Sequence, residues 1–361
     1  AGDLPERGTV YTIVQDHVDP QLLFVGTEFG VFFTRDEGAH WTRLKSGIPV
    51  IACRDLEIQR RENDLVVASF GRGFFVLDDY SPLRDLEPQA LEAPATIFPV
   101  RDALIYIPAT PIGDSGPGHQ GDDFWLAENP PFGAVITYHL AEGLTSLEDQ
   151  RREDEKEKIE AGEPVFYPSW DDLRAEDREQ DPAIVLTIRD GAGEVVRRLE
   201  GPTGKGFHRV SWDLRYPPTD PIELRGGGER APWDRDPSGA LTVPGEYLVT
   251  LSQRVRGEET ELAGPVGFRT RLLERSSTPA ADFGATVAFQ REAAELNRTV
   301  QGAGRVLGDV ESRLDHIRAA VDRTPGLPRA LLDEVDAMAA RVADMRTAMW
   351  GRYGQIPDLS G

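Results

Sequence analysis

A repeat of strand-like segments near the start of the chain constrains its fold more than any other feature. Residues 21–36 read QLLFVGTEFGVFFTRD and residues 64–79 read DLVVASFGRGFFVLDD, two runs rich in β-branched and aromatic residues and broken at a glycine. Such runs predict strands, and their repetition predicts neighbouring sheets that pack on one another. The segment ATIFPV at 95–100 is the candidate last strand of the second repeat. Two repeats leave apolar sheet faces uncovered, so residues 9–101 are expected to contact further sheets.

The turn that follows the first repeat has a defined spacing of residues. Thr34, Asp36, Gly38 and Trp41 are arranged as Thr-x-Asp-x-Gly-x-x-Trp. An aspartate oxygen can accept the backbone N–H groups of a tight loop, a glycine can take a positive φ, and an indole can cover the hairpin. The spacing resembles the Asp box of BNR-repeat β-propellers, in which the box is a folding device remote from any active site. We therefore interpret these four residues as structural.

The order of the parts along the chain resembles the C-terminal half of large bacterial BNR, sortilin-like proteins, which are often labelled glycosyl hydrolases. The most specific pieces of this resemblance are the Asp box and FGRGFFVLDDYSPLR at 70–84. It implies that residues 1–101 are the last blades of a partial β-propeller, with further blades from the same precursor, a cleaved partner chain or a neighbouring copy. It also implies an exported bacterial protein that is extracellular, on the cell surface or periplasmic. The start, AGDLPERGTVYT, is expected to be the interior of a longer chain.

The middle of the chain is predicted to form a β-sandwich. Residues 102–132 are rich in glycine and proline and are interpreted as a linker. Strand-like runs from 133 to 275 resemble the Ig/fibronectin-III-like modules of bacterial secreted proteins. The motif residues are Asp190, Gly193, Val196, Arg197 and Leu199, then Val210, Trp212 and Asp213, then Pro244, Gly245, Tyr247 and Val249. The charged insertion at 141–182 predicts a solvated helix and a loop, which its aromatic residues Phe166, Tyr167 and Trp170 are expected to dock onto the sandwich. A role in interaction is the less favoured alternative for this insertion.

The end of the chain, 276–361, is predicted to be helical. Apolar residues alternate at steps of four and three from Leu296 to Val321, and again from Leu331 to Met349. This spacing is typical of a coiled coil, and the short link PGLP at 325–328 favours an antiparallel helical hairpin. The fold class expected for the chain is therefore mainly β with a C-terminal α-helical hairpin. It combines a partial β-propeller, a β-sandwich and an antiparallel coiled coil.

Composition excludes several classes of partner and site. The formal net charge of −22 argues against a nucleic acid partner and against an anionic membrane surface, and no run of apolar residues is long enough for membrane insertion. Cys53 is the single cysteine, which excludes an intrachain disulfide and a multi-cysteine zinc site and predicts a buried, inert thiol. His119, Asp122 and Asp123 are interpreted as solvated loop residues. No metal and no cofactor are expected.

The sequence points to no catalytic residue. The six histidines are scattered singly, and none of the common hydrolase, metalloprotease or phosphate-binding motifs occurs. The favoured interpretation is a non-catalytic module that binds or assembles through its propeller and appended domains, with a glycan or a protein as ligand. One alternative is a glycoside hydrolase, of a sialidase- or xyloglucanase-like propeller type, whose active residues lie in blades upstream of this stretch. A second alternative is a structural subunit of a surface assembly.

Overall fold

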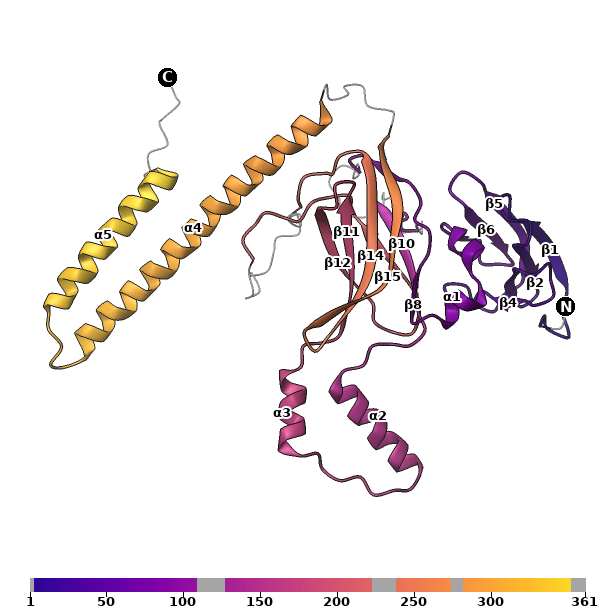
Figure 1. Ribbon diagram of the computed structural model, residues 1–361, viewed down its shortest axis with the longest axis horizontal. Coiled ribbons are helices and arrows are strands. Elements are labelled where there is room, and N and C mark those ends of the chain that lie inside the picture. The colour runs from indigo at the N-terminus through magenta and orange to yellow at the C-terminus, as the bar shows by residue number, and fades with distance from the viewer. Residues whose placement is uncertain (1–2, 109–126, 223–237, 274–281, 352–361) are drawn as a thin grey trace. The chain divides into compact units, whose positions relative to one another are not determined.

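The structure is a computed structural model that describes residues 3–108, 127–222, 238–273 and 282–351 (Figure 1). The protein is mainly β, with a pair of long helices at the C-terminal end. The chain divides into two compact units, and each is described by itself. The first unit comprises residues 1–214 and 244–275, and the second comprises residues 215–243 and 276–361.

Two antiparallel sheets open the first unit, and we call them the N-terminal sheet pair. The first sheet has the order β1 (Val10–Gln15), β2 (Leu23–Thr27), β3 (Gly30–Thr34) and β4 (Thr42–Arg43). The second sheet has the order β5 (Cys53–Gln59), β6 (Asp64–Ser69) and β7 (Phe74–Leu77). Each sheet contains one of the two repeats recognised in the sequence. The repeats therefore correspond to sheets, one after the other along the chain.

The two sheets share one apolar core. Alternate side chains of each sheet point into it, as the period of two along a strand requires. The buried members are Leu22, Phe24, Val31, Phe33, Cys53, Leu56, Ile58, Leu65, Val67 and Tyr80. Cys53 is buried as predicted, and this burial raises the pKa of its thiol. The backbones approach closely at Gly26, where a Cβ atom would lie 2.7 Å from the carbonyl oxygen of Cys53, so only glycine fits there.

The predicted last strand of the second repeat is wrong. After β7 the chain forms a 3-10 turn (η1, Ser81–Asp85) and a short helix (α1, Pro88–Glu92), and β8 (Ala95–Ile97) then pairs with a strand of a different sheet. That strand, β10 (Ala134–Leu140), is buried almost throughout and has a hydrogen-bonded neighbour on both edges. A strand buried on both faces favours a central position, and β8 supplies its second neighbour.

Eight strands form two further sheets, which we call the second sheet pair. One sheet has the order β13-β10-β8, with β13 at Gly206–Trp212. The other has the order β12-β11-β14-β15-β9. Its strands are β9 (Ala103–Ile105), β11 (Ala183–Asp190), β12 (Val195–Gly201), β14 (Gly245–Val255) and β15 (Glu258–Leu272). Because β8 and β9 lie at 95–105, this pair begins before the boundary predicted at 101 and takes in the start of the predicted linker.

Aromatic contacts join the two sheets of this pair. Trp212 at the end of β13 lies 5.2 Å from the ring of Tyr247 on β14 and 6.1 Å from the ring of Phe268 on β15, between ring centroids. All three side chains are buried. The inner faces of the two sheets therefore meet in an apolar core that includes these three rings.

The charged insertion forms two helices, α2 (Leu147–Glu160) and α3 (Trp170–Arg178). The expectation that its aromatic residues dock it onto the sheets is wrong. The exposed fractions of Phe166, Tyr167 and Trp170 are 81%, 78% and 70%. The helices are instead held together by ion pairs, so the aromatic side chains are not needed for their attachment.

The helices of the second unit are α4 (Phe283–Arg323) and α5 (Ala330–Trp350). They run antiparallel, since Arg346 pairs with Glu311 and Arg318 pairs with Asp336. Only one line of apolar residues on each helix is buried between them, at Leu307, Leu314, Val335 and Val342. Other positions of the predicted seam are exposed, at Leu296, Ile317, Met338 and Met345. Each helix of a pair can bury only the residues that face its partner. Because α5 is about half as long as α4, part of the predicted seam on α4 also has no partner helix beside it, so the full seam is not buried.

No described helix has the combination of length and apolar character needed to cross a membrane. His119, Asp122 and Asp123 lie outside the described residues, so the interpretation of these three as solvated loop residues remains a prediction from the sequence.

Candidate functional site

The four residues of the Asp-box spacing meet in one turn between β3 and β4. The Thr34 hydroxyl donates to Asp36 Oδ1 at 2.7 Å and accepts the backbone N–H groups of Asp36 and Gly38 at 3.2 and 3.1 Å. Asp36 in turn accepts the backbone N–H of His40 at 2.8 Å and contacts the His40 ring at 2.6 Å. These hydrogen bonds hold the pKa of the Asp36 carboxyl below its usual range, and the contact raises the pKa of His40.

The glycine and the tryptophan complete the same turn. Gly38 has a φ of +94°, a conformation that other residues rarely adopt. The Trp41 ring lies directly over Gly38, where a Cβ atom would be 3.3 Å from the ring, and its Nε1 donates to the Gly38 carbonyl oxygen at 3.1 Å. The contacts described for Thr34, Asp36, Gly38 and Trp41 all lie within the turn and stabilise its conformation. The arrangement offers backbone conformation and hydrogen bonding within the loop rather than a reactive group.

The second repeat has an aspartate at the matching position, and its environment differs. Asp79 has a φ of +42°, and its Oδ1 accepts from the hydroxyl of Ser81 at 2.6 Å and from the Ser81 backbone N–H at 3.3 Å. It therefore holds the start of η1 and not a return strand. The two aligned aspartates stabilise different turns, because β3 is followed by β4 whereas β7 is followed by a helix.

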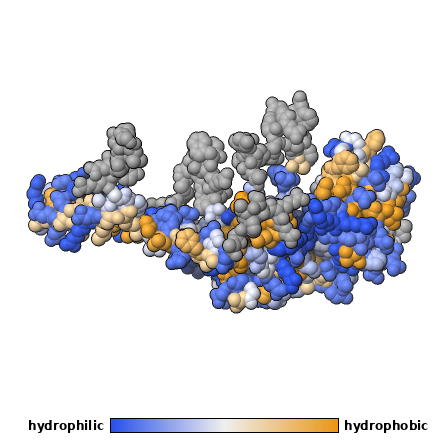
Figure 2. All heavy atoms as spheres, turned by 90° about the horizontal axis from the view of Figure 1, so that it is seen from above, coloured by the Kyte–Doolittle hydropathy of each residue, from blue (hydrophilic) through white to orange (hydrophobic). Residues whose placement is uncertain are grey.

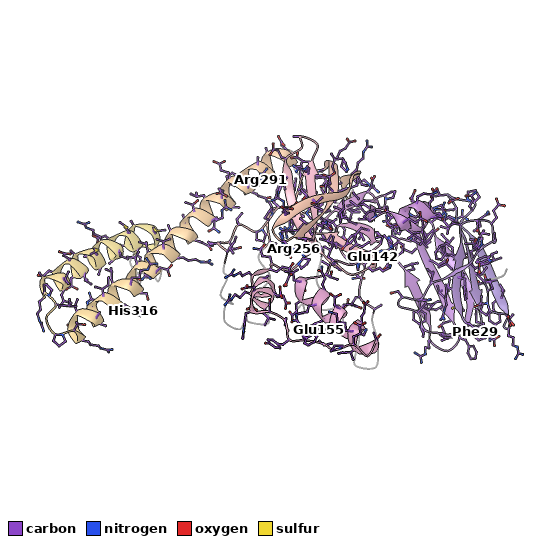
Figure 3. All side chains as sticks on the ribbon, turned by 60° about the horizontal axis from the view of Figure 1, so that its bottom comes forward. Phe29, Glu142, Glu155, Arg256, Arg291 and His316 are labelled. Atoms are coloured by element: carbon purple, nitrogen blue, oxygen red, sulfur yellow. The ribbon has the colours of Figure 1, made fainter. Side chains whose placement is uncertain are left out.

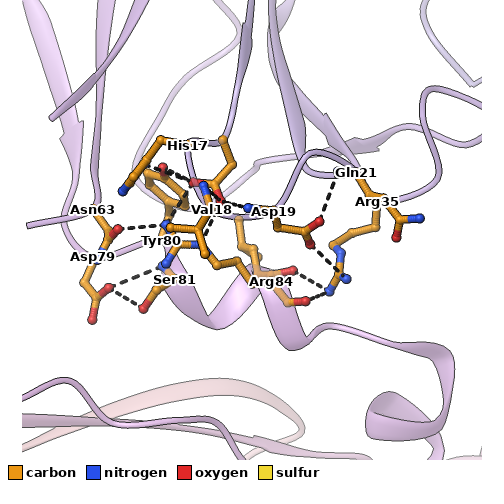
Figure 4. Close-up of polar contacts among 12 residues, drawn as sticks. His17, Val18, Asp19, Gln21, Arg35, Asn63, Asp79, Tyr80, Ser81 and Arg84 are labelled. Carbon is orange, nitrogen blue, oxygen red and sulfur yellow. Dashed lines mark hydrogen bonds and ion pairs between the residues drawn. The ribbon is translucent and has the colours of Figure 1, made fainter. Parts of the chain in front are cut away.

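A buried polar cluster joins the two sheets of the N-terminal pair (Figure 4). Arg84 binds the Asp16 carboxylate through two hydrogen bonds of 2.8 Å each, and also donates to Asn63 Oδ1 at 2.7 Å. The Tyr80 hydroxyl donates to Asp16 Oδ1 at 2.5 Å. The backbone N–H groups of Val18 and Asp19 donate to the other oxygen, Oδ2, at 3.1 and 2.7 Å.

The electrostatics of this cluster favour the ionised form of Asp16. Burial by itself would raise the pKa of Asp16, but the hydrogen bonds from Arg84, Tyr80 and the backbone outweigh burial and hold the pKa well below its usual range. Burial and the neighbouring carboxylate raise the pKa of Tyr80. The exposed fraction of the Asp16 side chain is 0%, and both of its oxygens are already occupied by donors. The cluster contains a carboxylate, a guanidinium and a phenol, and their mutual hydrogen bonds connect the two sheets.

The residues of this cluster belong to none of the site motifs predicted from the sequence. Tyr80 and Arg84 lie in the segment 70–84 that carries the family resemblance, so the stretch YSPLR was the available signal. A second tie runs beside the first, since Arg35 pairs with Asp19 at 3.2 Å and donates to the backbone carbonyls of Leu83 and Arg84. Asp16 is remote in sequence from these residues. Its partners are therefore visible only in the folded chain.

An exposed apolar face lies on strands β6 and β7, opposite the shared core, while β5 beside them carries Asp55 and Glu57 on the same face. Cross-strand register places Val66 beside Val76 and Ala68 beside Phe74 on this face. Phe74 and Val76 are 73% and 53% exposed, and Phe70 just beyond β6 is 66% exposed. In Figure 2 apolar residues gather over part of the surface of the N-terminal sheet pair, at the right of the view. We call these five residues the outer face of β5–β7.

The edge of the same sheet is also open. In the first sheet β3 pairs with β4, whereas in the second sheet β7 is the last strand within the described part of the chain. An edge strand presents unpaired backbone groups, and this one reads FFVL without a charged residue. The outer face and the β7 edge together form a surface that matches another sheet rather than a small ligand.

The described residues contain no group of three or more His, Cys, Asp or Glu placed to hold a metal ion. His17 lies 3.4 Å from Asp16, and His139 and His208 lie on the paired strands β10 and β13. His316 on α4, labelled in Figure 3, contacts the backbone carbonyl of Ser312 at 2.6 Å.

Comparisons with known proteins add little to this description. No protein-family model matches the chain, and no curated protein does. Among the solved structures that align with it are two of the extracellular domain of BT4673 from B. thetaiotaomicron, named a putative hybrid two component system in one case and a putative one component system in the other. Each is 12% identical over 74% of this chain, with TM-scores of 0.18 and 0.16. The chain spans about a quarter of their length, and likeness at this level carries no argument about fold or function.

Proposed function

We propose that this protein is a non-catalytic binding and assembly module whose N-terminal sheet pair is part of a larger β-propeller, followed by a β-sandwich and an antiparallel coiled coil. The observation that carries the proposal is the outer face of β5–β7, with Phe74 and Val76 largely exposed beside an open edge strand. The Asp-box geometry at Thr34, Asp36, Gly38 and Trp41 supports the propeller part.

The opposite face of the same sheet indicates what would cover the outer face. There Leu56, Ile58, Leu65 and Val67 pack on the neighbouring sheet and are buried. A further sheet of the same kind, placed on the other side, would bury Phe74, Val76 and Phe70 in the same way. Complete burial of one such side chain is worth about 1.5–3 kcal/mol, so three of them give a strong driving force for association.

The occupant would be another set of blades, from the same precursor, a cleaved partner chain or a neighbouring copy. The location proposed for such a protein is extracellular, at the cell surface or in the periplasm of a bacterium. This part rests on the resemblance of the sequence to exported bacterial proteins, and fractionation of a producing cell would test it.

The test compares the chain with a Phe74→Ser/Val76→Ser variant. Sedimentation velocity and binding of a dye for exposed apolar surface are measured on both, with Ile107→Ser as a matched control because Ile107 is 78% exposed elsewhere in the first unit. We expect the wild type to self-associate, the double variant to sediment as a monomer with weaker dye binding, and the control to behave as the wild type. A wild-type chain that stays monomeric when dilute and binds no dye would contradict the proposal. Turnover of a panel of glycan substrates would contradict its non-catalytic part.

A further inference from the structure

The charged insertion forms a fixed structural element, which we call the α2–α3 hairpin and define as residues 146–179. Ser146 accepts the N–H of Asp149 at the start of α2, and Ser169 accepts the N–H of Asp172 at the start of α3, both at 3.1 Å. Each helix is therefore capped by its own sequence. This local capping explains how a segment so rich in charge keeps a defined shape.

Ion pairs then hold the two helices against each other. Arg151 on α2 binds the Glu176 carboxylate on α3 through hydrogen bonds of 2.7 and 2.9 Å, and also contacts Glu155 at 3.0 Å. At the base of the hairpin the N–H of Leu147 donates to Glu179 at 2.6 Å, and Arg256 in the β14–β15 turn pairs with Glu179 at 3.4 Å. Glu155 and Arg256 are labelled in Figure 3. The loop between the helices is thus carried on a braced support.

This support presents an aromatic patch to solvent. Phe166, Tyr167 and Trp170 are 70–81% exposed and lie within five residues of one another, and Ile159 near the end of α2 is 66% exposed. A cluster of exposed aromatic side chains is unfavourable in water and typically marks a surface that another molecule covers. Tryptophan and tyrosine in particular carry much of the binding energy at protein interfaces. We call the side chains of Phe166, Tyr167 and Trp170 the aromatic patch.

The surroundings of the patch are strongly acidic. From 147 to 181 there are 14 Asp and Glu residues against six Lys and Arg. A hollow of about 430 Å³ at the hairpin is lined by Phe166 and Val165, by four acidic side chains and by two basic ones, Arg151 and Lys158. Arg151 pairs with both Glu155 and Glu176, so one positive charge faces two carboxylates. The surface therefore combines apolar anchoring with uncompensated negative charge.

We propose that the α2–α3 hairpin binds a basic segment of a partner protein, with lysine or arginine side chains against the acidic helices and an apolar side chain on the aromatic patch. Charge complementarity selects this occupant, because opposite charge speeds association and excludes acidic partners. An arginine of the partner also gains from contact with the face of Trp170 or Tyr167. Those two rings contact each other edge to face, with centroids 6.4 Å apart and an interplanar angle of 64°, and both remain largely exposed.

The experiment uses the full chain as bait for a phage library of random 12-residue peptides. Enriched peptides are synthesised and titrated by calorimetry against the wild type, against Phe166→Ala/Trp170→Ala and against Phe289→Ala as a matched control, since Phe289 is 70% exposed on α4. We expect enriched peptides to carry net positive charge and at least one large apolar residue. Their affinity should fall at least tenfold in the double variant, remain unchanged in the control and weaken as salt is raised. Circular dichroism should show equal helix content in all three proteins.

Several results would overturn the proposal. One is enrichment of no peptide, or of peptides without net positive charge. Another is an affinity that the Phe166→Ala/Trp170→Ala variant retains. Vesicles of phosphatidylcholine are included as a competing surface, because exposed aromatic loops also insert at lipid interfaces. Depletion of the wild type by these vesicles, with the double variant left in solution, would assign the patch to a membrane and not to a peptide. None of these outcomes depends on the outer face of β5–β7, so the two proposals fail independently.

Discussion

The N-terminal sheet pair and the second sheet pair both pack two sheets against each other, but different side chains join the sheets in each pair. In the second pair, the ring cluster of Trp212, Tyr247 and Phe268 closes the core between two sheets. In the N-terminal pair, an apolar core is supplemented by the buried Asp16–Arg84 ion pair, and Phe70, Phe74 and Val76 are left largely exposed on β6 and β7 or beside them. The two pairs therefore differ in how their sheets are joined, by aromatic rings in one and by rings together with a buried ion pair in the other.

The largest effect should distinguish the two apolar surfaces directly. Replacing the fully buried Trp212 by alanine removes a large ring from a closed core, and we expect a loss of about 3–5 kcal/mol in the free energy of unfolding of the first unit. The same change at Phe74, which is 73% exposed, should alter it by no more than about 0.5 kcal/mol. Urea denaturation followed by circular dichroism measures both. Equal losses would mean that Phe74 is already buried and that the contrast between the pairs is false.

The second prediction concerns the ion pair that distinguishes the N-terminal sheets. The variant Asp16→Asn leaves Arg84 buried without its counter-charge, and we expect a loss of about 3 kcal/mol near neutral pH. The pKa of Asp16 is lowered in the folded state, so its contribution is present above its unfolded pKa of about 4 and is lost as pH falls below that value.

The pH dependence provides the control for this prediction. Between about pH 5 and pH 2, the free energy of unfolding of the wild type should fall more steeply than that of Asp16→Asn, because the variant has no carboxylate to protonate at this position. Acid titration of both proteins, monitored by circular dichroism and by hydrogen exchange of β1 and β2, separates the curves. Parallel curves would show that the carboxylate is not held in its charged form by Arg84 and Tyr80.

The smallest effect is expected at the turn that only the first sheet has. Thr34→Ala removes a buried hydroxyl that makes three hydrogen bonds within the turn, and we expect a loss of about 1–2 kcal/mol. Thr34→Ser keeps the hydroxyl and should retain most of the stability. Thermal unfolding of the two variants side by side measures the difference. If serine and alanine were equally destabilising, the hydroxyl would not hold the turn.

Local sequence carried a large part of this description. The spacing of Thr34, Asp36, Gly38 and Trp41 predicted a turn because the side-chain hydrogen bonds that form it lie within eight residues. The heptad spacing after 283 predicted two helices for the same reason, since helical periodicity is a property of neighbouring residues. The mainly-β character of the rest followed from its β-branched and aromatic runs.

The errors fell where distant segments choose their partners. ATIFPV reads as a strand, and part of it is one, but the edge of β10 determined its sheet. Phe166, Tyr167 and Trp170 look like anchors in an otherwise charged segment, yet Arg151 and Glu176 hold the helices without them. In each case the apolar character of the side chains was plain from the sequence. Which residues they would contact could not be predicted from composition or spacing.

The sequence by itself determined the turn at residues 34–41, the two C-terminal helices and the strand-forming character of the apolar runs, because these features depend mainly on residues close together in the chain. The tertiary structure alone decided that Asp16 meets Tyr80 and Arg84, that β8 joins β10, and that the outer face of β5–β7 is left exposed. These features depend on which surfaces are buried against one another. Burial is a property of the packed chain, so the same apolar or charged residue becomes core, tie or open surface according to what the fold places beside it.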